Sequence, residues 1–196
     1  QSKFYNRKRF HWAVIIHELV TPITGGSRVY LQEDHFLLEH YQNHETNRTG
    51  YLRGLAVDCF THPNSDRNSH YFARELWWTG RPFTAAKEFK RHVEMNRWPA
   101  ERAESLLYLA DIAGAMGGAD LPPTGVELAI GGGILPELNS KMTREELKTL
   151  QIHFCHLALQ TEPGRREQLI KLAQIYMRRG QWLTAKDYAA AASELP

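Results

Sequence analysis

The most specific group of residues able to do chemistry lies near the N-terminus, where His17 and Glu18 are adjacent and Trp12 precedes them. An imidazole can bind a divalent metal or transfer a proton, and a carboxylate can act as a general base. The spacing is not that of a zinc protease, because Thr21 stands where the HExxH motif needs its second histidine. A purely structural role for the pair stays open beside the catalytic one.

An extended segment is expected to hold these residues. Residues 9–20 mix β-branched and aromatic side chains in the way a largely buried strand does, and Pro22 then stops the strand. Further extended segments are expected at residues 28–31 and 36–41. The sequence therefore predicts a short N-terminal β-segment within residues 1–46.

Helical spacing dominates the rest of the chain, most clearly in residues 68–96. Two apolar runs there are separated by Gly80, which suits a left-handed position after a helix, and by Pro82, which suits the first turn of the next one. Together with Gly80, the small residues Ala73 and Ala85 have a spacing that resembles a tetratricopeptide unit. These features predict an antiparallel helical hairpin, which needs neighbours to bury its apolar face.

The same pattern returns near the C-terminus, where Ala173, Gly180 and Ala185 stand in the same relation to one another. We therefore predict an α+β, mostly α protein. A short β-segment would occupy residues 1–46, and tetratricopeptide-like hairpins would occupy residues 47–196, with a Gly/Pro-rich insertion at residues 117–140. That the two hairpins are merely amphipathic, without a repeat relationship, remains an alternative.

Composition excludes some classes of function and favours others. Lysine plus arginine number 24 against 22 aspartate plus glutamate, so charge gives no reason to expect a nucleic-acid partner. No apolar run is long enough to cross a bilayer, and no signal peptide is visible. Cys59 and Cys155 are expected to be free thiols of a reducing compartment, with one disulfide as the alternative. We accordingly expect a cytoplasmic protein without a transmembrane segment.

Five segments, taken in order, resemble the C-terminal portion of family 2-type inverting glycosyltransferases of the GT-A fold. They cover most of the chain outside the insertion, and each is weakly specific alone. They are RFHWAVIIHE (residues 9–18), HYQNHETNRTGYL (40–52), DRNSHYFARELWWTGRPFTAAKEFKRH (66–92), WPAERAESLLYLA (98–110) and EPGRREQLIKLAQIYMRRGQW (162–182).

The resemblance implies that residues 1–46 are the C-terminal β-segment of a GT-A-like catalytic domain with a sugar-transferring active site. Arg9, Trp12 and Glu18 would border that site, and His17 would help to hold a divalent Mn or Mg ion beside a nucleotide sugar. An acceptor hydroxyl, on a glycan or a protein, would attack the anomeric carbon while the metal neutralises the leaving diphosphate. The family's Asp-x-Asp motif and nucleotide-binding strands are expected upstream of Gln1, so this chain alone would lack the nucleotide-binding half.

A second hypothesis needs no chemistry. The helical hairpins could form a protein–protein interaction module, in which Trp77, Trp78, Trp98 and Trp182 lie partly in the core and partly in a peptide-binding groove. In the enzyme hypothesis the same helices would support the catalytic domain or bind an acceptor or partner.

Overall fold

The computed structural model describes residues 10–13, 19–22, 50–95, 98–118, 138 and 142–195. The chain divides into two compact units, Gln1–Pro63 and Asn64–Pro196. The predicted boundary between residues 46 and 47 lies outside the described residues and stays a prediction.

In its described residues, the first unit contains two short strands and one helix. Strand β1 (Phe10–Ala13) pairs antiparallel with β2 (Leu19–Pro22), with Phe10 opposite Pro22 and Ala13 opposite Leu19. This pairing requires a reversal of the chain, so the prediction of one continuous strand over residues 9–20 is wrong. Both halves of that segment favour extended structure, so composition could not reveal the reversal. The remainder of the predicted β-segment, residues 23–46, lies outside the described residues.

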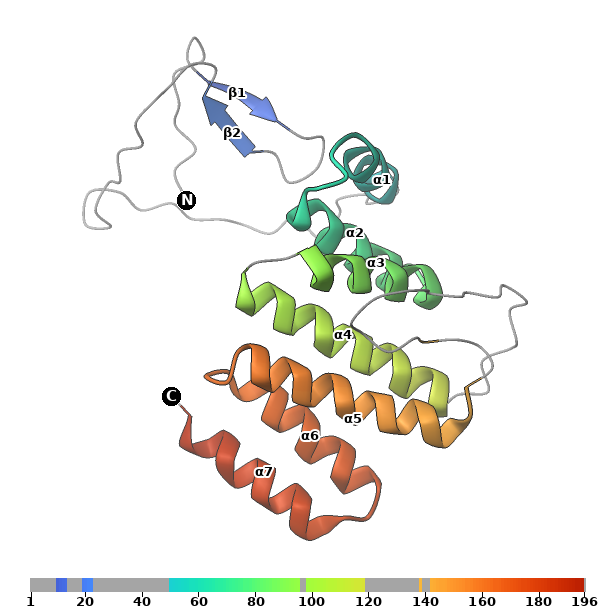
Figure 1. Ribbon diagram of the computed structural model, residues 1–196, viewed down its shortest axis with the longest axis vertical. Coiled ribbons are helices and arrows are strands. Elements are labelled where there is room, and N and C mark those ends of the chain that lie inside the picture. The colour runs from blue at the N-terminus through green and yellow to red at the C-terminus, as the bar shows by residue number, and fades with distance from the viewer. Residues whose placement is uncertain are drawn as a thin grey trace, which may run out of the picture. The chain divides into compact units, whose positions relative to one another are not determined.

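Helix α1 (Tyr51–Thr61) completes the first unit. The second unit is entirely helical in its described part, which confirms that the protein is mostly α. Its helices are α2 (Asp66–Trp78), α3 (Pro82–Met95), α4 (Pro99–Gly118), α5 (Arg144–Thr161), α6 (Arg166–Arg178) and α7 (Trp182–Glu194). Each packs against the next, which makes three successive hairpins, α2–α3, α4–α5 and α6–α7 (Figure 1).

The first and third hairpins turn in the same way. Gly80 and Gly180 have φ angles of 74° and 72°, so both occupy the left-handed region predicted for them. The amide of Arg81 donates to the carbonyl of Leu76 at 2.9 Å, and Gln181 donates to Tyr176 at 3.0 Å. These bonds satisfy carbonyls that the helix ends would otherwise leave without partners. The turn is thus built twice, one hundred residues apart.

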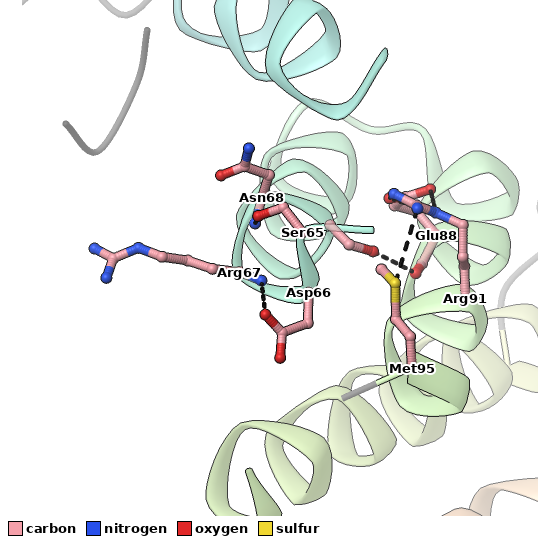
Figure 2. Close-up of polar contacts among 8 residues, drawn as sticks. Ser65, Asp66, Arg67, Asn68, Glu88, Arg91 and Met95 are labelled. Atoms are coloured by element: carbon pink, nitrogen blue, oxygen red, sulfur yellow. Dashed lines mark hydrogen bonds and ion pairs between the residues drawn. The ribbon is translucent and has the colours of Figure 1, made fainter. Parts of the chain in front are cut away.

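The N-termini of the helices differ more than the turns do. The hydroxyl of Ser65 accepts from the amide of Asn68 at 3.3 Å and caps α2, beside which Glu88 and Arg91 of α3 form an ion pair (Figure 2). Thr143 and Glu146 form a capping box at the start of α5, in which Thr143 N–H donates to the Glu146 carboxylate at 2.7 Å. Helix α6 begins at Arg166, and the side chain of its N-cap residue, Arg165, makes no capping hydrogen bond.

Close packing of α4 on α5 depends on a glycine inside α4. A Cβ atom at Gly117 would lie 3.2 Å from the Cβ of Leu147, so any larger residue there would require α5 to shift. Helix α4 ends at Gly118, so residues 117 and 118 of the predicted insertion belong to the helix. Residues 119–137 and 139–140 of the predicted insertion lie outside the described residues.

Cys59 and Cys155 are not joined by a disulfide, and Cys155 is fully buried in α5. Burial raises the pKa of the Cys155 thiol to about 12, so it packs as a small apolar side chain. Among the helices that the structure describes, none is sufficiently long and apolar to cross a membrane.

Candidate functional site

The residues predicted for sugar transfer fall almost entirely outside the described part of the chain. Arg9, His17 and Glu18 lie outside it. The backbone of Trp12 lies in β1 opposite Val20, and its side chain is not described. Within the described ranges, no group of three His, Cys, Asp or Glu side chains could hold a metal ion. The predicted catalytic and metal-binding roles therefore stay predictions.

A buried polar cluster lies where α2, α3 and α4 meet. Ser105 of α4 stands between two histidines, with its Oγ 2.9 Å from Nδ1 of His70 and 2.8 Å from Nδ1 of His92. All three side chains are at most 1% exposed. On the outer side, Nε2 of His70 lies 3.7 Å from the Glu104 carboxylate, and Nε2 of His92 lies 3.8 Å from that of Glu101.

The shared hydroxyl makes the two imidazoles unequal. A serine has a single O–H to donate, so it can donate to one Nδ1 and must accept an N–H from the other. Burial, the neighbouring His92 and the Arg74 guanidinium lower the pKa of His70 from 6.5 to about 3, while Glu101 opposes the change. His70 is therefore neutral at ordinary pH, which suits it to accept the serine proton at Nδ1 and to direct Nε2–H toward Glu104.

Serine, histidine and glutamate side by side are also the components of a hydrolytic triad, but here the serine hydroxyl is 0% exposed. A nucleophile that no substrate can reach does no chemistry. We assign the cluster a structural role, in which it fixes the register of α4 on the first hairpin. Sequence reasoning missed it, although His70 lies three residues before Ala73, and His92 three after Phe89, on buried helix faces.

The exposed candidate site is an apolar groove of about 380 Å³ on the C-terminal hairpin. Its lining residues come from both helices of that hairpin: Ile170, Ala173, Gln174, Met177, Trp182, Ala185, Lys186, Ala189 and Ala192. Ile170, Met177 and Trp182 are 41%, 48% and 66% exposed, a large amount of apolar surface for one short hairpin. We call this surface the α6–α7 groove.

Comparison of the third hairpin with the first shows which surface of the first hairpin corresponds to the groove. One hundred residues earlier, the positions of Ile170, Ala189 and Ala192 are occupied by His70, Phe89 and His92. All three of those side chains contact α4: both histidines meet Ser105, and the Phe89 ring stacks on Tyr108 with centroids 4.8 Å apart. The α6–α7 groove is therefore the face that α4 covers in the first hairpin, left open in the third.

The four tryptophans considered for core or groove divide unevenly. Trp182 lines the groove. Trp77 is half-buried and stands at the position equivalent to Met177. Trp78 and Trp98 are 51% and 61% exposed, and Trp78 lies under the Arg74 guanidinium at 4.7 Å, so neither belongs to the core.

Fold and groove together define an array of helical hairpins with an uncovered apolar face on its last member. No family model matches the chain, and no curated protein matches it.

Proposed function

We propose that residues 64–196 form a tetratricopeptide-like protein-binding module. One observation carries this proposal: the hairpin built at α2–α3 is repeated at α6–α7, but only the first copy has its apolar face covered. Repeat arrays bury such faces by stacking, and an exposed one is a surface ready for a partner. The matched glycine turns and the three hairpins in series support the tetratricopeptide-like assignment.

The module would belong to a glycosyltransferase. The five ordered segments that resemble family 2-type enzymes support this part of the proposal. In it, Arg9, Trp12 and Glu18 border the site, and His17 helps to hold Mn or Mg with a nucleotide sugar. The helices would position a glycan or protein acceptor or a partner protein, in the cytoplasm.

The module is tested by direct binding between purified proteins. Proteins that co-purify with the full chain would be identified, and the affinity of each purified candidate would be measured by titration calorimetry against the full chain. We expect at least one to bind with a Kd in the micromolar range or tighter, as for a specific interface. If none binds directly, the module proposal is wrong.

The enzyme is tested separately, on the longest form of the protein. We expect transfer or hydrolysis of a nucleotide sugar that depends on Mn or Mg, and a loss of turnover of about tenfold or more in His17→Ala. His62→Ala, in the exposed loop after α1, is the control. Unchanged turnover in His17→Ala would show that His17 is not part of the site. The absence of transfer or hydrolysis with every nucleotide sugar would contradict the proposal that the protein is an enzyme.

A further inference from the structure

We infer that the α6–α7 groove binds an amphipathic helix supplied by a partner protein, laid across the hairpin as α4 is laid across α2–α3. This inference rests on the proposed binding function and adds where the partner binds and in what form. The molecule itself contains the reference case, because an equivalent hairpin is already covered by a helix.

The α4 seam shows which positions of a docked helix touch such a hairpin. Ser105 meets the histidines at 70 and 92, and Tyr108, three residues later on the same face, stacks on Phe89. One residue of the docked helix thus lies between the two hairpin helices, and the next residue on that face covers the centre of α3.

The groove residues at the equivalent positions indicate which side chains the partner helix should carry. Ile170 and Ala192 replace the two histidines, so the partner should carry an apolar residue where α4 carries Ser105. Ala189 replaces Phe89 and leaves the volume of a ring unfilled, so a larger aromatic side chain should follow three positions later. Lys186 lines the groove and is exposed where the first hairpin has the buried Ala86, so an acidic side chain on the partner would complement it.

A second copy of this chain fits the same surface less well. A twofold contact with its axis at the alanines of the groove would bring small side chains against small side chains and leave voids between them. With its axis at Lys186, the same contact would bring two like charges together. The groove chemistry therefore favours a different chain with large apolar side chains.

The probe is a 20-residue synthetic copy of α4, residues 99–118, that carries Ser105→Leu and Tyr108→Trp. It keeps the acidic residues Glu101 and Glu104. We would titrate it into the full chain by calorimetry and follow the methyl resonances of Ile170 and Met177 by NMR. We expect saturable binding that shifts both methyl groups, and affinity at least fivefold weaker for the unsubstituted copy of α4.

Two matched variants locate the binding. Met177→Lys places a charge in the groove and should raise the Kd of the probe at least tenfold. Leu183→Lys changes an equally apolar side chain on α7 that is 81% exposed and does not line the groove, and should leave the Kd within twofold. Thermal unfolding of both variants would show that each is folded, and Ala189→Glu would replace Met177→Lys if that variant is not.

Three results would overturn the inference: no binding at millimolar probe, equal affinity for the Met177→Lys variant and the parent, or a dimer in sedimentation that Met177→Lys abolishes. A natural partner that binds the parent and the Met177→Lys variant equally well would also overturn it. That last result would leave the module proposal standing, whereas the absence of any directly binding partner would end the module proposal.

Discussion

The first and third hairpins of the second unit share a backbone and differ in what covers them. Both have helices that begin and end at equivalent positions and turn through a left-handed glycine. Yet His70 of the first hairpin is 1% exposed, whereas Ile170, at the equivalent position of the third, is 41% exposed. The comparison shows that the sequence of a hairpin determines its turn, while the helix that packs on it determines which of its residues are core.

The side chains have diverged accordingly. Against α4, the first hairpin presents two histidines and a phenylalanine, which need a polar and an aromatic partner at defined positions. At the same places the third hairpin presents isoleucine and two alanines, which need only apolar surface. Four substitutions or measurements on the two hairpins and the helix that covers the first would break or sharpen this comparison.

Among the changes that remove a buried polar group, the largest effect is expected from Ser105→Ala. This change removes the hydroxyl that the two Nδ1 atoms share, so each of these buried nitrogens loses that hydrogen-bond partner. Each unsatisfied buried group costs about 1–3 kcal/mol, so we expect a loss of about 2–4 kcal/mol in the free energy of unfolding, measured in urea. Ser193→Ala, exposed on α7, should change stability by less than about 0.5 kcal/mol. Equal losses of unfolding free energy in the two variants would show that the cluster does not stabilise the packing of α4 on the first hairpin.

The next largest effect on stability is expected from substitution of the two turn glycines. Gly80→Val and Gly180→Val each force a β-branched residue to a positive φ, which should cost about 1–3 kcal/mol in both hairpins. Gly164→Ala is the control, because nothing lies within 4 Å of a Cβ at that position and its φ is ordinary. Melting temperatures of the three variants measure the effect. A clear cost in only one hairpin would show that the turns are not equivalent.

A smaller effect concerns pH and belongs to the covered hairpin alone. The pKa of His70 is lowered from 6.5 to about 3, so below pH 6.5 the unfolded chain binds a proton that the folded chain refuses. Stability should therefore fall as the pH falls through this window, with a slope of at most about 1.4 kcal/mol per pH unit from this group. Replacing His70 by glutamine should reduce the slope measured by urea unfolding at several pH values. An unchanged slope would mean that His70 does not resist protonation.

The smallest effect is expected on the open face. Ile170→Ser should change stability by less than about 1 kcal/mol, because this side chain is already in contact with water. Phe89→Ala, on the covered face of the first hairpin, should cost about 3–5 kcal/mol, as for a fully buried ring. Chemical denaturation measures both. A cost at Ile170 that matches the cost at Phe89 would contradict the view that the α6–α7 groove is uncovered.

Local signals predicted the hairpins well. Gly80 and Gly180 act within a few residues of chain, and the structure confirms the left-handed turn at both. The reversal between β1 and β2 was not predicted, because it depends on which segments pair with one another.

The candidate site was harder to predict. Four tryptophans were considered for the core or a groove, but only Trp182 lines the groove, and four of its nine lining residues are alanines, which carry no signal of their own. The histidine cluster depends on a contact between positions 70 and 105, a separation that periodicity along one helix cannot show. The predicted glycosyltransferase residues act through segments outside the described ranges and stay predictions.

The central claim is that α3 is covered by a packed helix and its equivalent, α7, is not. Native-state hydrogen exchange on the full chain tests it most directly, because it measures the opening free energy of each helix separately. We expect the amides of α3 to exchange only with global unfolding, and those of α7 to exchange through smaller openings that the helical probe suppresses. Equal protection of α3 and α7 without the probe would contradict the account.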